Sequence, residues 1–343
     1  MRAYGARAIG PRMVNISVCT PVRPTTAPAS AIIPPDTRTS AVGTAAATSS
    51  SIPVETVPGA AYGFICYVAS LHRMPIFIAV LLGIVEGLTE FLPVSSTGHL
   101  VLVGHWLGLS DDDPATSSFE IVVQLGAILA VVAHYRVLLA QRVRGLFTGD
   151  AASRRLLVAL VLAFAPTAIA GLLLRKTIKA HLFGTLPVAG ALVVGGVVMI
   201  VVERVRARRK RTGKEGLEHV TAARALAIGF AQCFSMWPGA SRSMCTIVAG
   251  QLAGLSTGTA AEFSFLLALP TLGAATVYEG FKARHVLASN GGMVSLAVGM
   301  VVSFFVAWAV IAAFLKYLRS RGLEPFGWYR VVLGLLVLWI LER

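Results

Sequence analysis

From residue 75 to residue 342 the chain is a series of apolar segments joined by short polar or glycine-rich connections. Only 13% of the residues are charged and the mean hydropathy is +0.75, whereas about 25% of the residues in a soluble domain are charged. Because backbone polar groups have no water to bind inside a bilayer, apolar spanning segments of this kind are helical. The sequence therefore predicts an all-α, polytopic membrane helix bundle, with apolar segments at about 75–92, 96–109, 119–134, 156–174, 186–203, 221–236, 243–255, 262–280, 293–316 and 326–342.

Two of these segments, 96–109 and 243–255, are too short to cross a bilayer alone, since a crossing helix needs about 20 residues and at least roughly 17. Each follows another apolar segment after a break at Pro93 or Pro238. Non-helical backbone at membrane depth is tolerated where it lines a cavity. We therefore expect two re-entrant helical hairpins.

The two halves of the apolar region, about 75–203 and 221–342, carry similar motifs in the same order, including a Gly-Leu-Ser triplet at the end of each short segment. Arginine-rich loops at 135–155 and 204–224 are expected in the cytoplasm. Counting crossings from these loops brings the first hairpin in from the exterior and the second from the cytoplasm. The sequence thus predicts an inverted-topology repeat in which the tips of the two hairpins meet near the midplane.

The N-terminal region has a different composition. Residues 1 to about 60 are rich in Ala, Pro, Thr and Ser and have no sustained apolar period, which is typical of disorder. The membrane pattern begins directly after Met74. Residues 1–73 are therefore either a disordered N-terminal extension or the product of a misassigned start codon, and residues 74–343 form the membrane domain.

The formal net charge is +14, but the basic residues lie in short runs between apolar segments, as in cytoplasmic loops. A nucleic-acid partner is therefore not expected. The four cysteines form no CxxC pair and no Cys/His cluster, so neither a zinc site nor a disulfide framework is indicated.

Glu86 and Glu90 lie four residues apart inside an apolar segment, so their carboxylates share one helix face. Ionisable groups at membrane depth are costly and usually functional, and two adjacent carboxylates favour a cation or a proton between them. We expect the pair to hold Mg²⁺ or Ca²⁺. The alternative is a helix end at which one or both carboxylates reach interfacial water.

Ser95, Ser96 and Thr97 follow the break at Pro93, where a new helix begins. A helix N-terminus with free amides is an anion-binding site, although ordinary N-capping explains any single hydroxyl equally well. Ser96 and His99 are three residues apart, so the imidazole is expected near that hydroxyl or a water beside it.

The second break carries Ser241, Arg242 and Ser243 between apolar segments. Arginine matches a phosphate group through two parallel hydrogen bonds, so Arg242 is expected to bind phosphate with the hydroxyls around it. The alternative is an arginine that pairs with Glu86, Glu90 or Glu262 only to hold the fold. Gln124 and Glu262 occupy matching places in the two halves and are expected beside the site.

These motifs closely resemble those of the undecaprenyl-diphosphatase family, also called bacitracin-resistance proteins. The resemblance rests on a Glu-Gly-x-Thr-Glu-Phe-Leu-Pro-x-Ser-Ser-Thr-Gly-His stretch, complete from Glu86 to His99, and a Pro-Gly-x-Ser-Arg-Ser stretch, complete from Pro238 to Ser243. It covers the chain from about Pro75 onwards. The family usually continues Gly-Ala-Thr after the second stretch, whereas this chain has Met244-Cys245-Thr246, which puts the width of the pocket in question.

The resemblance implies hydrolysis of undecaprenyl diphosphate to undecaprenyl phosphate and inorganic phosphate, which recycles the lipid carrier for peptidoglycan synthesis and confers bacitracin resistance. It also implies a multi-pass protein of the bacterial plasma (inner) membrane, surrounded by membrane lipids; a homodimer is a further possibility. Matched position by position, the family's catalytic residues fall on Glu86, Glu90, Ser96, His99 and Arg242. The hydroxyl residues beside them are expected, together with Arg242, to bind the substrate: Ser95, Thr97, Ser241 and Ser243.

In the mechanism that we expect, Arg242 and the turn amides grip the diphosphate, a divalent ion on Glu86 and Glu90 neutralises its oxygens, and Ser96 or a water polarised by His99 attacks the terminal phosphorus. The alternative is a transporter or flippase for a polyprenyl phosphate lipid, because secondary transporters also have inverted repeats and broken helices. A transporter needs no base beside a hydroxyl, so His99 next to Ser96 favours the enzyme.

Overall fold

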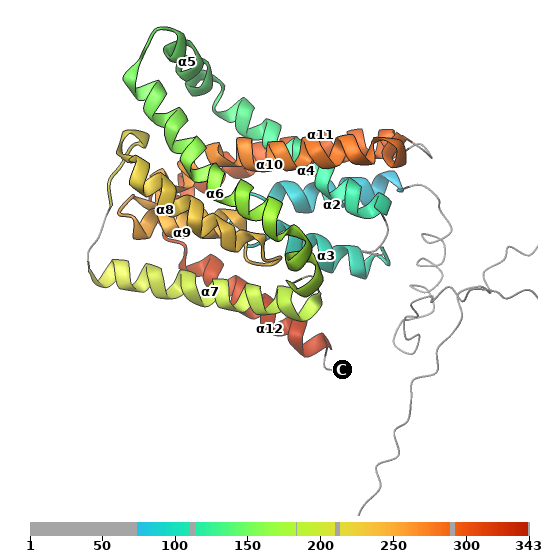
Figure 1. Ribbon diagram of the computed structural model, residues 1–343. Helices are drawn as coiled ribbons and strands as arrows, with labels where there is room; N and C mark the ends of the chain where they lie inside the picture. Colours follow the sequence, from blue (N-terminus) through green and yellow to red (C-terminus); the bar gives the residue numbers. More distant parts are fainter. Residues whose placement is uncertain (1–73, 110–113, 183, 210–212, 289–291, 342–343) are drawn as a thin grey trace, which may run out of the picture. The chain divides into compact units, whose positions relative to one another are not determined.

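In the computed structural model, residues 74–109, 114–182, 184–209, 213–288 and 292–341 are described, and they are helical without any β-strand (Figure 1). This confirms the predicted all-α class. The expectation for residues 1–73 lies outside the described residues. The α-helices, with two short 3₁₀ helices, are α2 (Ile76–Thr89), α3 (Ser96–Trp106), α4 (Pro114–His134), α5 (Arg136–Phe147), α6 (Ala151–Leu182), α7 (Thr185–Arg208), η2 (Leu217–His219), α8 (Ala222–Gln232), η3 (Cys233–Met236), α9 (Arg242–Leu252), α10 (Thr257–Ala288), α11 (Gly292–Leu318) and α12 (Glu324–Leu341).

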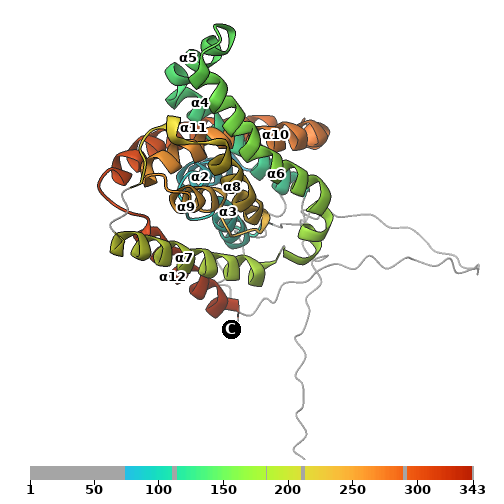
Figure 2. The same cartoon turned by 60° about the vertical axis from the view of Figure 1, so that its left-hand side comes forward.

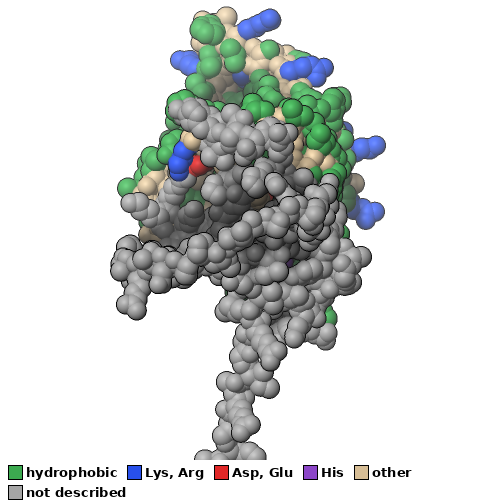
Figure 3. All heavy atoms as spheres, turned by 90° about the vertical axis from the view of Figure 1, so that its right-hand side faces the viewer, with side chains coloured by type: hydrophobic (Ala, Val, Ile, Leu, Met, Phe, Trp, Pro, Cys, Tyr) green, Lys and Arg blue, Asp and Glu red, His purple; other side chains and the backbone are tan. Residues whose placement is uncertain are grey.

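Membrane-length helices dominate the described part of the chain. Hydrophobic side chains cover most of the described surface that is visible in Figure 3, and several Lys and Arg side chains lie towards its top. Such a surface fits the hydrocarbon of a bilayer. The chain is a multi-pass membrane protein. Within the described ranges, the helices long and apolar enough to cross are Thr116–His134, Ala151–Leu174, Leu186–Arg208, Thr257–Lys282 and Met293–Leu318.

The short helices α2, α3, α8 and α9 lie at the centre of the bundle, with longer helices around them (Figure 2). α2 packs on α11 and α8 packs on α6, while α7 pairs with α12 and α4 with both α10 and α11. Each short pair is therefore enclosed by helices from both halves of the sequence. This arrangement places the two Pro-containing breaks inside the protein.

Glycines allow the short helices to approach their neighbours closely. A Cβ atom on Gly87 of α2 would lie 2.8 Å from the carbonyl oxygen of Ser303 on α11, and one on Gly229 of α8 would lie 2.5 Å from that of Ala163 on α6. Real Cβ atoms do not approach backbone so closely, so each position requires glycine at this helix separation. Small residues at helix contacts are typical of membrane proteins, where close packing replaces the hydrophobic effect between helices.

The segment 135–155, expected as a loop, is largely helical. α5 alternates arginines with apolar residues, and the prediction missed it because this segment contains no uninterrupted apolar run. Asp150 then caps α6: its carboxylate accepts hydrogen bonds from the hydroxyl of Ser153 at 2.6 Å and from the Ser153 amide at 2.8 Å. These bonds, together with one from the Ala152 amide, hold the pKa of Asp150 below its usual value.

Candidate active site

The two breaks have the same local geometry. Ser95 and Ser241 are the two non-glycine residues with positive φ in the described part of the chain, at 76° and 72°. Each caps the helix that follows: the Ser95 hydroxyl accepts the amide of Gly98 at 3.3 Å, and the Ser241 hydroxyl accepts that of Met244 at 3.2 Å. N-capping, the simpler of the two explanations for these hydroxyls, is thus present. A left-handed backbone is unfavourable for serine and is held by the surrounding packing.

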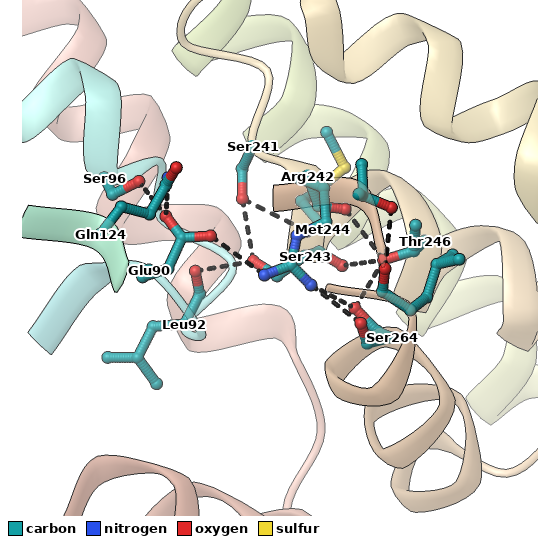
Figure 4. A network of polar contacts seen from close by, with 12 residues as sticks. Glu90, Leu92, Ser96, Gln124, Ser241, Arg242, Ser243, Met244, Thr246 and Ser264 are labelled. Carbon is teal, nitrogen blue, oxygen red and sulfur yellow. Dashed lines mark hydrogen bonds and ion pairs between the residues drawn. The ribbon is translucent and has the colours of Figure 1, made fainter. Parts of the chain in front are cut away.

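Glu90 is the centre of a buried polar network (Figure 4). Its Oε2 atom accepts hydrogen bonds from the Ser96 hydroxyl at 2.5 Å and from Nε2 of Gln124 at 3.3 Å. Its Oε1 atom forms an ion pair with Nη2 of Arg242 at 3.0 Å, and the two side chains are only 4% and 8% exposed. The tertiary structure therefore joins an acid, a hydroxyl and an arginine from two distant motifs.

Protein groups hold Arg242 on both sides. Opposite Glu90, its Nη1 atom donates to the carbonyl oxygen of Ser264 at 2.9 Å and to the Ser264 hydroxyl at 3.2 Å. Pairing of Arg242 with Glu90 is one of the expected alternatives to phosphate binding by this arginine. A phosphate that binds to Arg242 in this arrangement replaces or shares the bond to Glu90.

The serines of the second turn connect it to the first. Ser243 donates to the carbonyl oxygen of Leu92 at 2.8 Å, and the hydroxyls of Ser241 and Ser243 are 3.0 Å apart. Since the proton of Ser243 points to Leu92, Ser241 is the donor between the two hydroxyls. The two turns are thus in direct contact.

His99 has different partners from those expected. Its Nδ1 atom is 2.7 Å from the carbonyl oxygen of Ser95, and its Nε2 atom is 2.6 Å from the hydroxyl of Tyr329. A carbonyl only accepts, so Nδ1 carries the proton and Nε2 accepts from the tyrosine. The Ser96 hydroxyl points to Glu90 instead of His99, and Thr97 is exposed.

Glu86 is 1% exposed, and neither of its carboxylate oxygens has a hydrogen-bond partner in the described structure. The described residues contain no group of three or more His, Cys, Asp or Glu side chains that could hold a metal. Mg²⁺, however, is commonly held by one or two carboxylates plus substrate phosphates and water. The orphaned oxygens of Glu86, close in sequence to Glu90, fit a cation of this kind.

Comparisons with known proteins identify the family. A sequence model described as "Bacitracin resistance protein BacA" matches residues 79–336. The chain belongs to the BacA family. An undecaprenyl-diphosphatase of Sorangium cellulosum is 62% identical over 265 residues, which are 77% of this chain and 86% of the relative. Proteins of the same name from Aromatoleum aromaticum and Nitrosomonas europaea are each 47% identical, over 78% and 76% of this chain and 97% and 92% of their own lengths.

Two residues of α12 contact the site and were missed by the motif analysis. Tyr329 binds His99, and Arg330 donates to backbone carbonyls of both turns. Arg330 lies inside the apolar segment 326–342 and is therefore a charged group at membrane depth, the same signal that pointed to Arg242. Nothing in the sequence marks Tyr329.

Other expected neighbours fall in different places. Gln124 contacts Glu90, whereas no described hydrogen bond joins Glu262 to this network. Met244, the residue directly after the Ser-Arg-Ser stretch, is buried. A Cβ on Gly195 of α7 would lie 2.9 Å from its methyl group, so the Met244 side chain packs against α7, where a glycine makes room for it.

Proposed function

We propose that this protein hydrolyses undecaprenyl diphosphate to undecaprenyl phosphate and inorganic phosphate. The observation that carries the proposal is the buried Ser96–Glu90–Arg242 network between the two turns, which combines a nucleophile, a base and a phosphate-binding cation. The three named relatives are undecaprenyl-diphosphatases. The reaction would return the lipid carrier to peptidoglycan synthesis and lower sensitivity to bacitracin.

The network suggests how the reaction proceeds. Arg242 exchanges part of its contact with Glu90 for oxygens of the diphosphate, which frees the Glu90 carboxylate to act as a base. Ser96 then attacks the terminal phosphorus, its proton passes to Glu90, and the bond to the bridging oxygen breaks to release undecaprenyl phosphate. Water then hydrolyses the phosphoserine and releases phosphate; to polarise this water, Nε2 of His99 exchanges its hydrogen bond from Tyr329 for one from the water. In the one-step alternative, that water attacks the phosphorus directly and Ser96 only orients Glu90.

Glu86, together with Glu90, would hold a Mg²⁺ or Ca²⁺ ion, which neutralises charge on the diphosphate oxygens when it is bound. The buried, unpartnered oxygens of Glu86 support this assignment. Ser95 and Ser241, whose hydroxyls cap α3 and α9, would contribute by fixing the direction of the backbone amides in the first turns of these helices. Ser243 links the turns, and Thr97, being exposed, is available to the substrate.

We also propose that residues 74–343 form an inverted repeat, with halves 75–203 and 221–342, in the bacterial inner membrane. α3 and α9 have 11 residues each, about 16 Å of helix, or half of the hydrocarbon core, which supports re-entrant hairpins. The helix packing also matches between the halves: α2 of the first half packs on α11 of the second, and α8 of the second half packs on α6 of the first. The lipid tail would lie along the apolar outer walls of the hairpins.

The test is phosphate release from C55 or C15 isoprenyl diphosphate by the full chain in detergent, with and without EDTA. We expect Arg242→Ala and Glu90→Ala to lose at least about 100-fold in rate and EDTA to abolish release. Arg204 and Glu324 provide a matched control, because they form an exposed ion pair at 2.7 Å; Arg204→Ala and Glu324→Ala should retain activity.

Two outcomes would contradict the proposal. Folded wild-type protein that releases no phosphate would exclude the diphosphatase and favour the transporter of a polyprenyl phosphate lipid, which moves its substrate without cleaving it. Activity that survives both Arg242→Ala and Glu90→Ala would place the reaction elsewhere in the chain. Release that is insensitive to EDTA would remove the divalent cation from the mechanism and leave the serine route intact.

A further inference from the structure

Arg330 of α12 contacts both turns and is fully buried, with 0% exposure. Its Nη1 atom donates to the carbonyl oxygen of Pro93 in the first turn at 3.2 Å. Its Nη2 atom donates to the carbonyl oxygens of Gly239 at 2.8 Å and Ala240 at 3.1 Å in the second turn. It also reaches Ala191 on α7 at 3.1 Å. One guanidinium therefore joins the backbones of the two turns, which are more than a hundred residues apart in the sequence.

Among the described residues, no acid forms an ion pair with Arg330. The ion pairs of the described residues join other arginines to carboxylates, and the partners of Arg330 are neutral carbonyls. A buried charge is costly unless it is hydrogen-bonded. Carbonyl oxygens accept from both terminal nitrogens of Arg330 without cancelling its charge, while its Nε atom has no partner in the described structure. The turns therefore lie over a net positive charge that an anion can complement.

The neighbouring helix leaves room for this guanidinium. A Cβ atom on Gly195 of α7 would lie 3.0 Å from Cζ of Arg330 and closer still to Nη2. On the same helix, a Cβ on Gly190 would meet nothing within 4 Å. The two glycines thus differ in whether a methyl group would displace Arg330.

We propose that Arg330 is a positioning residue of the phosphatase: it holds the Glu90 and Arg242 turns in alignment, and its uncompensated charge draws the diphosphate to them. The inference rests on the proposed function, since it assigns a role in that reaction. Both effects come from a residue that does not touch the reacting atoms.

The two effects separate in the kinetics of Arg330→Lys and Arg330→Met. Lysine keeps the charge but cannot bridge both turns with a planar fork, so we expect kcat to fall about 10- to 100-fold with KM within about threefold of wild type. Methionine also removes the charge, so KM should rise about 10-fold in addition. A lysine variant with wild-type kcat, or a methionine variant with wild-type KM, would overturn the corresponding half of the proposal.

Gly195→Ala tests the alignment without altering Arg330 or the network around Glu90. Alanine favours a helix over glycine at either position, so Gly190→Ala is the matched control. We expect Gly195→Ala to lower kcat about 10-fold or more and Gly190→Ala to leave it unchanged. Equal kcat in the two variants would show that the position of Arg330 does not matter to the reaction.

A measurement without turnover separates this inference from the proposed function. Spin labels at Leu88→Cys on α2 and Leu252→Cys on α9, both exposed, report the distance between the two hairpins in a chain without its four native cysteines. We expect the distance distribution to broaden in Arg330→Met and to stay narrow with Arg204→Met. Inactive wild-type protein would refute the proposed function, whereas an unchanged distribution in Arg330→Met would refute the alignment role.

Discussion

Glu90→Gln is the substitution whose effect on stability follows most directly from the structure. The Glu90 carboxylate accepts bonds from Ser96, Gln124 and Arg242. A glutamine keeps the shape but has one acceptor oxygen, and its amide faces at least one donor. Arg242 then remains buried without a charged partner, and breaking a buried ion pair in this way costs about 3–5 kcal/mol.

The assay is a double-mutant cycle with Glu90→Gln, Arg242→Met and the double variant, read from reversible unfolding in mixed micelles with increasing SDS. Because the second substitution removes the charge that the first leaves unpaired, the double variant should be more stable than the sum of the single effects predicts. We expect a coupling free energy of about 2–3 kcal/mol.

The exposed Arg204–Glu324 pair, at 2.7 Å with side chains 54% and 34% exposed, is the control for this cycle. Surface pairs of this kind contribute about 0.2–1 kcal/mol. A coupling energy for Glu90 and Arg242 no larger than that of the surface pair would refute the reasoning, because it would mean that burial does not strengthen the interaction.

Three further outcomes are expected. Gly229→Ala should destabilise the protein by about 1–3 kcal/mol through overpacking, while Gly258→Ala, whose Cβ would meet nothing within 4 Å, should not; SDS unfolding compares them. The pKa of Asp150 is lowered, chiefly through the hydrogen bond from the Ser153 hydroxyl, so its contribution to stability is present at neutral pH and is lost as the pH falls through that lowered pKa. The difference in melting temperature between wild type and Asp150→Asn should therefore shrink in acid. A difference that stays constant with pH would contradict this. Ser96→Ala should abolish phosphate release if the serine is the nucleophile, and full activity in that variant would leave only the direct attack by water.

The sequence alone predicted most local features of this protein. Apolar length identified the membrane helices, and the segments predicted to start at 96 and 243, after the breaks at Pro93 and Pro238, begin within one residue of α3 and α9. N-capping by Ser95, Ser96 or Thr97 was expected from the sequence, and Ser95 is the residue that caps α3. These features depend on neighbours within one or two turns, which the sequence specifies directly. α5 was missed because its mixed arginine and apolar pattern is short and lacks a continuous apolar run.

The partners of the site residues were decided only by the tertiary structure. Spacing along a helix suggested Ser96 with His99, but packing brought Glu90 to Ser96 and gave the Nε2 atom of His99 to a tyrosine 230 residues away. Glu90 and Arg242 are 152 residues apart, and the sequence left three acids open as partners. Sequence patterns fix which groups share a helix face, whereas the choice among distant partners depends on how helices pack, and that is set by contacts such as those of Arg330 that join both halves of the chain.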